Sequence, residues 1–148
     1  MTNKLALSFR LVDINTEEFA ILEDGYTKDG DTRLGTFLNF GMDPEHYVLS
    51  SNVKFQFEQN EKPFLIISAT CSFELEKEAW DSLLNEDNDA LVIPEGFTSH
   101  MAVITVGTVR GILHEKTRDT PFNDYIIPPI NLTELIKEDL VLPFEEQQ

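Results

Sequence analysis

The sequence predicts an α+β fold: a four-stranded antiparallel sheet followed by one long and one short helix. Apolar and polar residues alternate through much of the first half of the chain, as in half-buried strands. Apolar residues then recur at helical spacing from Phe97 to Glu115, and Pro128-Pro129 separates this helix from a shorter one. Because 148 residues are close to the usual size of one domain, we expect a single domain over residues 1–148.

The first strand is expected from Lys4 to Val12, where apolar side chains alternate with small or polar ones. The next segment, Asp13 to Thr32, carries seven carboxylates around two glycines and is interpreted as a long acidic connection. The apolar run from Phe19 to Leu22 leaves open an extension of the strand into this segment.

The other three strands are expected over Gly35 to Met42, from about Tyr47 to Glu58, and over Phe64 to Glu76. Short turns at Asp43-Pro44-Glu45 and Gln59-Asn60-Glu61-Lys62 would join them into a meander. In each strand one face is mostly apolar and the other mostly polar, which predicts a sheet with one solvated surface. The polar surface would gather Glu58, Glu74 and Glu76 into an acidic patch, with an ordinary solvated face as the alternative.

A short helical pattern and a linker follow the sheet. Trp80, Leu83 and Leu84 lie at helical spacing, and the acidic segment from Asn85 to Ala90 leads to the apolar run Leu91 to Ile93. Pro94 and Gly96 then mark the boundary before the long helix.

The long helix, from near Phe97 to near Glu115, would measure about 28 Å. Its β-branched centre favours a strand by propensity, so its assignment depends on periodicity. One apolar stripe comprises Phe97, Met101, Ile104, Thr108 and Ile112. A second stripe, more than a quarter turn away, comprises Ala102, Val106, Val109 and Leu113. Because two stripes need two burial surfaces and the sheet supplies one, we expect a second subunit to supply the other, with packing inside one subunit as the alternative.

Two glycines four residues apart support this interface. Gly107 and Gly111 would lie on one side of the helix and permit close approach of a neighbouring backbone, although each costs about 1 kcal/mol of helix stability relative to alanine. The predicted oligomer interface consists of Met101, Ile104, Gly107, Thr108, Gly111 and Ile112.

The second helix is expected after the proline pair, where Asn131 can accept hydrogen bonds from the free amides of the first turn. Glu134 at the third helical position can complete a capping box. The apolar side of this helix would comprise Leu132, Leu135, Ile136 and Leu140.

Composition excludes several classes of function. With 27 acidic and 11 basic residues, the net charge of −16 opposes binding to nucleic acid and favours basic or apolar partners; keeping an apolar protein soluble is the alternative role of this charge. No apolar segment reaches the length of a membrane span, so we expect no membrane insertion. The start of the chain resembles a signal peptide only superficially, because Arg10 interrupts its short apolar run and no small-residue cleavage site follows, so we expect a cytoplasmic location.

The sequence predicts neither a catalytic site, a metal site nor a cofactor. Cys71 lies in an apolar strand and is expected to be a buried, inert thiol. The histidines, His46, His100 and His114, show no spacing typical of a metal site or of acid–base catalysis. We therefore do not expect an enzyme.

Several local motifs resemble the SecB family of protein-export chaperones, and the SecB-like branch more closely than the archetypal export factor. They are Leu91 to Pro94, Gly107 to Leu113, Lys116-Thr117, Thr120-Pro121 and Pro128-Pro-Ile-Asn131. The order of elements also matches over most of the chain. The strands match only in pattern, and the long Asp13 to Thr32 connection departs from the archetype.

The resemblance implies a homotetramer in which subunits pair their sheets into dimers and the long helices lie between the dimers. It implies an ATP-independent holdase that binds unfolded or precursor polypeptides in apolar grooves between sheet and helix and keeps them competent for export. Candidate groove residues are Phe55, Phe57, Trp80 and Phe122, with core packing as the alternative for each.

In this family an acidic sheet surface docks the SecA translocase motor, so Glu58, Glu74 and Glu76 are the candidate docking residues. Two alternatives remain: a SecB-like chaperone dedicated to one partner, such as an antitoxin, and a non-chaperone small ligand-binding domain.

Overall fold

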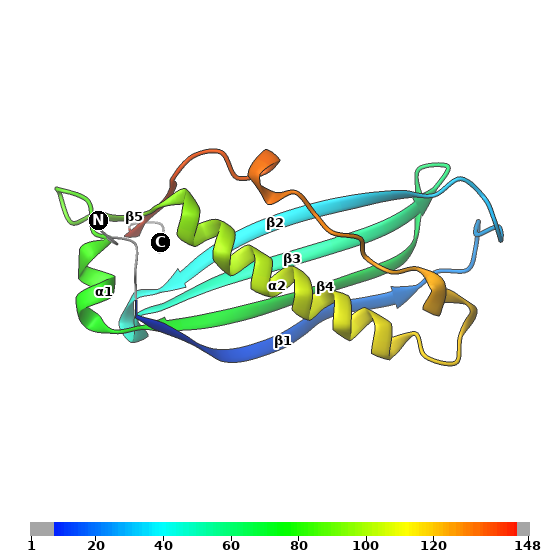
Figure 1. Cartoon of the computed structure of the whole chain (residues 1–148), viewed down its shortest axis with the longest axis horizontal. Coiled ribbons are helices and arrows are strands. Elements are labelled where there is room, and N and C mark those ends of the chain that lie inside the picture. The colour runs from blue at the N-terminus through cyan, green and yellow to red at the C-terminus, as the bar shows by residue number, and fades with distance from the viewer. Residues whose placement is uncertain (1–7, 145–148) are drawn as a thin grey trace.

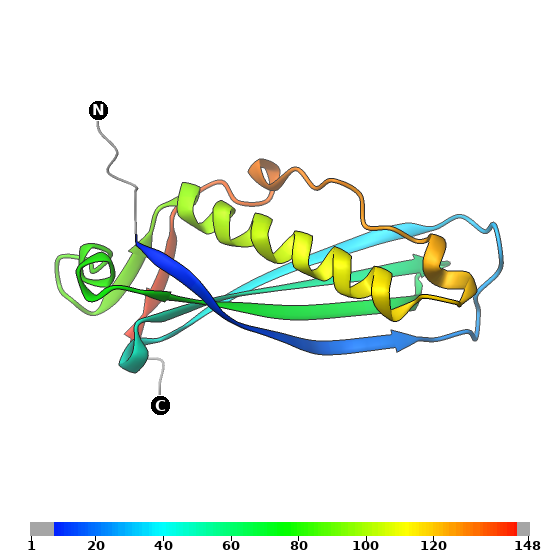
Figure 2. The same cartoon turned by 60° about the horizontal axis from the view of Figure 1, so that its bottom comes forward.

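A computed structural model describes residues 8–144 and confirms the α+β class (Figure 1). Four long strands form the main sheet, and a 22-residue helix, α2 (Glu95–Lys116), crosses one face of it. The strands are β1 (Phe9–Ile21), β2 (Arg33–Asp43), β3 (Val48–Gln59) and β4 (Lys62–Leu75). No helix of residues 8–144 covers the opposite face of the sheet (Figure 2).

The strand order is β1-β4-β3-β2, with every pair antiparallel. The expected meander therefore holds for β2, β3 and β4, whereas β1 pairs with β4 instead of β2. Residues 22–32 make this possible, because they form a connection long enough to pass the ends of two intervening strands, each about 4.8 Å wide. As a result, β1 and β2 are the two edges of the sheet (Figure 1).

The first strand is longer than its apolar pattern indicates. Residues 4–7 of the predicted strand lie outside the described residues, while β1 continues to Ile21 through most of the segment interpreted as a connection. Register shifts between Leu11 and Asp13 and between Thr16 and Glu18 break the alternation. Residues 10–18 are also exposed, so neither face of this stretch requires a regular apolar pattern.

The sequence did not predict the second, smaller sheet. After the short helix α1 (Lys77–Ser82), strand β5 (Ala90–Ile93) pairs antiparallel with β6 (Leu140–Pro143). The predicted linker, between α1 and β5, is a turn in which the side-chain oxygen of Asn85 accepts hydrogen bonds from the amides of Asp89 and Ala90. This pairing fixes the C-terminal part of the described chain beside the start of α2.

Helix α2 forms despite its β-branched centre. Threonine hydroxyls within it donate to carbonyls one turn earlier, at 2.8 Å from Thr105 to Met101 and 2.9 Å from Thr108 to Ile104. The helix packs over β3 and β4 (Figure 2). Beneath it lie two apolar clusters, one rich in phenylalanine and one around Trp80, Phe97 and Met101.

The segment after α2 returns along the helix on the β2 side (Figure 1). It contains two short 3-10 helices, η2 (Pro121–Asp124) and η3 (Leu132–Glu134). The arginine Nε of Arg110 donates to the carbonyl of Ile127 at 2.7 Å and its Nη2 to that of Pro128 at 2.9 Å, which holds the segment against α2.

The predicted second helix is a single 3-10 turn. Its cap is present, because the side-chain oxygen of Asn131 accepts from the amide of Thr133 at 3.2 Å. The helix does not continue, and Leu140 belongs to β6 instead. Leu132 and Ile136 are nevertheless buried, and they pack against Ala102 of α2. The short cap therefore serves to place a covering segment rather than to start an amphipathic helix.

Candidate functional site

Most of the apolar side chains of helix α2 are buried within its own chain. The sheet on one side and residues 117–144, which we call the C-terminal segment, on the other bury Ala102, Val106, Val109 and Leu113. The second burial surface expected from another subunit is thus partly supplied by this segment. Met101, predicted at the oligomer interface, is 0% exposed and belongs to the core. The other five predicted interface residues remain at least partly accessible: Ile104, Thr108 and Ile112 are half-buried, and Gly107 and Gly111 are exposed.

A third side of α2 carries three exposed residues at a spacing of four, which we call the outer strip: Val103, Gly107 and Gly111. Val103 is 55% exposed, and a Cβ placed on either glycine would meet no atom within 4 Å. Val103 was missing from the predicted interface, although its spacing of four residues from Gly107 could have identified it. The outer strip is an apolar, low-relief surface that another backbone can approach closely.

The edge strand β1 presents a second exposed apolar region. Leu11, Val12 and Ile14 are 42%, 44% and 50% exposed, although they lie in the first half of a 13-residue strand. Leu11 and Val12 end the strand predicted over Lys4 to Val12, whereas Ile14 fell in the segment interpreted as a connection, because register shifts disrupt the alternation there. An uncovered edge with apolar residues is a surface on which another strand can pair.

The four predicted groove residues are all core residues in this structure. Phe55, Phe57 and Phe122 lie together in the phenylalanine-rich cluster, whereas Trp80 lies in the other cluster. None is more than 5% exposed, so they do not line an open groove. Their proposed role in client binding stays a prediction.

An open groove lies elsewhere, between β2, the start of α2 and the C-terminal segment. We call it the C-terminal groove, and its volume is about 650 Å³. Leu135 and Val141 are 50% and 56% exposed there, and Phe40 lines its base in a half-buried position. Lys137, Glu138 and Asp139 form its polar rim. The sequence pattern predicts Leu135 on the apolar side of a helix, but the helical turn ends at Glu134 and Leu135 is exposed.

The three predicted docking glutamates do not form one patch. Glu58 lies opposite Pro63 at one end of β4, whereas Glu74 is eleven residues further along that strand, on the order of 35 Å away. Glu74 also forms an ion pair with Arg10, at 2.8 Å. Of the three, Glu74 and Glu76 lie near each other, because both are at the end of β4 opposite to Glu58.

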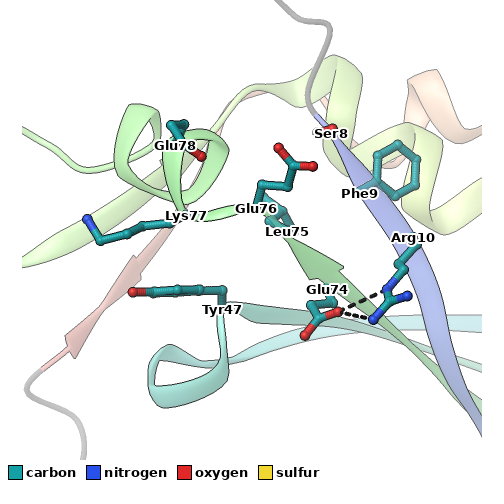
Figure 3. A pocket seen from close by; sticks show the side chains of 9 residues that line it. All are labelled: Ser8, Phe9, Arg10, Tyr47, Glu74, Leu75, Glu76, Lys77 and Glu78. Carbon is teal, nitrogen blue, oxygen red and sulfur yellow. Dashed lines mark hydrogen bonds and ion pairs between the residues drawn. The ribbon is translucent and has the colours of Figure 1, made fainter.

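Glu74 and Glu76 line a charged cavity of about 550 Å³ beside Tyr47 (Figure 3). The guanidinium of Arg10 faces Glu74, while the side chain of Lys77 points away from this pair (Figure 3). A 2.8 Å hydrogen bond to Asp81 raises the pKa of Lys77, so its charge is engaged within α1. Arg10 and Lys77 thus pair with different carboxylates, in separate directions.

His46 has a partner that the sequence analysis did not identify. Its Nδ1 lies 2.8 Å from a carboxylate oxygen of Asp43, and this hydrogen bond and the charge of Asp43 raise the pKa of His46. Glu45 is close enough for the three side chains to surround an ion, but all are exposed and the ion pair accounts for their arrangement. Cys71 is 0% exposed, in agreement with its predicted burial.

Within residues 8–144, no helix has the length and apolar character required to cross a membrane. Comparisons with family models, curated proteins and solved structures found no match to this chain. The functional interpretation therefore rests on the exposed surfaces described above and on the resemblance of the local motifs.

Proposed function

We propose that this protein is an ATP-independent holdase that binds unfolded polypeptides, as the SecB-like motifs imply. The observation that carries the proposal is the C-terminal groove, in which the side chains of Leu135 and Val141 are 50% and 56% exposed. Binding of an extended apolar segment in the groove would remove these apolar side chains from water, which is energetically favourable. Residues 135–141 line most of this groove, and Phe40 of β2 and Thr98 of α2 complete its lining.

The proposal includes a homotetramer. The β1 edge offers unpaired backbone groups and exposed apolar side chains, which suits pairing of two sheets into a dimer. The outer strip of α2 suits close packing of helices between two such dimers. These two surfaces lie on different elements, so a chain can use both at once.

An export role in the cytoplasm, with docking to a SecA-type motor, belongs to the same proposal. The net charge of −16 favours a basic docking partner. Since Glu58 is remote from the other two glutamates, Glu74 and Glu76 are the residues that we assign to such docking.

Aggregation of a reduced, unfolded client, followed by light scattering without nucleotide, tests the holdase proposal. The full chain at micromolar concentration should suppress aggregation at near-stoichiometric ratios. Failure to suppress it at several-fold excess would contradict the proposal.

A substitution in the groove sharpens this test. Leu135→Asp places a charge where the client's apolar side chains would lie and should reduce suppression several-fold, because burying an unpaired carboxylate is costly. Leu22→Asp is the matched control, since Leu22 is 43% exposed in the connection after β1 and outside the groove. Equal effects of the two variants would show that the groove is not the client site.

A further inference from the structure

The β1–β2 connection and η2 lie near each other at one end of the molecule (Figure 1). Residues of both line a further cavity. Its volume is about 460 Å³, which is within the usual range for small-ligand sites. The lining residues are Tyr26, Lys28, Asp29, Pro121, Asp124 and Tyr125. None of them belongs to the C-terminal groove.

Two tyrosines form the aromatic part of this cavity. Their hydroxyl oxygens lie 3.0 Å apart, and their rings are half-buried against the phenylalanine-rich cluster. The ring centroid of Tyr26 is 4.8 Å from those of Phe64 and Phe122, and that of Tyr125 is 5.1 Å from Phe64. Packing on the core therefore holds both rings in place before any ligand binds.

The loop that carries Tyr26 and Asp29 is also held in advance. The buried side chain of Gln59 accepts from the amide of Thr27 at 2.8 Å, and it donates to the carbonyl of Thr27 at 3.0 Å and the hydroxyl of Thr32 at 3.2 Å. On the other wall, the side-chain amide of Asn123 donates to the carbonyl of His114 at 2.9 Å. Both walls thus have fixed positions, which reduces the entropy lost on binding.

The charged groups at the rim favour a cation. Asp29 and Asp124 are both close enough to Tyr26 to raise the pKa of its hydroxyl, although the hydrogen bond with Tyr125 is the main cause. Neither carboxylate forms an ion pair within residues 8–144. Lys28 offsets one of the two negative charges, and the rest of the protein is strongly acidic.

We propose that this cavity binds the guanidinium group of an arginine side chain from a polypeptide partner. A planar guanidinium can stack on a tyrosine ring and at the same time donate to carboxylates at the rim. This recognition requires aromatic faces and acidic groups together, and Tyr26, Tyr125, Asp29 and Asp124 supply both. The site is separate from the C-terminal groove, and the proposal does not depend on holdase activity.

Chemical-shift titration of the isotope-labelled full chain with N-acetyl-arginine amide tests the assignment. Saturable shifts should concentrate on amides of residues 26–29 and 121–125. N-acetyl-citrulline amide, which has nearly the same shape without the charge, should bind at least about tenfold more weakly, since both the cation–π and the ionic interaction are lost. Equal binding of the two probes, or no saturable binding of either, would overturn the proposal.

Charge variants distinguish an effect of the carboxylates in the cavity from an effect of the net charge of the protein. Asp29→Asn with Asp124→Asn should weaken binding of the arginine probe about tenfold, whereas Lys28→Gln should tighten it about twofold. Asn tolerates the left-handed backbone of Asp29, whose φ is 66°, so the first variant should retain the fold. The control, Glu86→Gln with Asp87→Asn, changes the net charge equally on an exposed turn outside the cavity. Equal weakening by the two double variants would overturn the site.

n-Butylguanidine, which carries the guanidinium with the same single charge but no peptide groups, identifies the source of the ligand. The arginine amide should bind more tightly than n-butylguanidine if a polypeptide is the partner, and the reverse order would contradict the peptide assignment. An aggregation assay on the same samples is scored separately. Loss of suppression with intact arginine binding would count only against the holdase proposal, and the converse only against this one.

Discussion

Gln59 is a single buried side chain that determines where the β1–β2 connection lies. It is 3% exposed and makes three hydrogen bonds to that connection. Gln59→Ala should therefore reduce the free energy of unfolding by about 1–3 kcal/mol, because buried polar groups lose their partners. Urea denaturation measures this loss. Gln56→Ala, on the open face of the sheet, should change stability by less than about 0.5 kcal/mol, and equal losses would contradict the role of Gln59.

Tyr26 provides a pH-dependent test at the same scale. The hydrogen bond with Tyr125 is the main cause that raises the pKa of Tyr26 from 10.0 to about 12. Because the pKa is higher in the folded state, the resulting stabilisation is complete below about pH 10 and is lost as the pH rises through 12.

Tyr125→Phe should shift the pKa of Tyr26 back toward 10.0 and remove this alkaline dependence of stability. Ultraviolet titration of the phenolate bands, together with unfolding curves between pH 9 and pH 12, measures both effects. An unchanged titration of Tyr26 in the variant would contradict the hydrogen-bonded pair.

Individual residues could be predicted from the sequence where burial alone decides their role. Cys71 lies in a regular apolar alternation, and its burial followed from that pattern. The roles of the candidate groove residues could not be predicted in this way. Phe55 and Phe122 are large and apolar, which suits a groove as well as a core, and only the packing around them distinguishes the two.

Gly107 and Gly111 of α2 belong to the proposed contact with the helix of another subunit. Within one chain, alanine at Gly107 and Gly111 would meet no atom and should stabilise the helix by about 1 kcal/mol per site. If the outer strips of two subunits pack closely, the added methyl groups should instead separate them. The double variant should then dissociate to a smaller oligomer in light scattering coupled to gel filtration. Increased thermal stability with an unchanged mass would contradict the helix interface.

The exposed edge of β1 gives an independent prediction. Ile14→Lys places a charge on the middle of this edge and should prevent pairing of two sheets, which would halve the mass of the assembly. Ile126→Lys is the matched control, because Ile126 is 59% exposed on the segment after α2. Sedimentation velocity distinguishes the variants. Unchanged assembly of the Ile14 variant would contradict pairing through this edge.

Elements with one buried face could be predicted from the sequence, and those without one could not. Strands β3 and β4 and helix α2 have a regular apolar side because they pack on each other. Most of β1 is exposed on both faces, so its extent had no apolar pattern to reveal it. The sequence likewise predicted an α-helix after Asn131, but the chain instead leaves the 3-10 turn and pairs β6 with β5.

At the scale of the whole molecule, local periodicity predicted the layers, whereas long-range pairing determined the order of the strands. The β1–β4 and β5–β6 pairs join segments far apart in the chain, and no local pattern specifies such partners. The C-terminal groove results from these long-range contacts, because its lining comes from β2, α2 and β6 and from the segment before β6. The sequence therefore predicted the class of fold but not the groove.

The proposed function requires that an assembly of this chain bind an unfolded polypeptide without nucleotide. Multi-angle light scattering coupled to gel filtration, with and without a reduced, unfolded client, measures whether it does. The chain alone should have about four times the mass of one 16.9 kDa subunit. With the client, a single heavier species should contain the assembly and one client chain. A monomer that elutes separately from the client would contradict the claim.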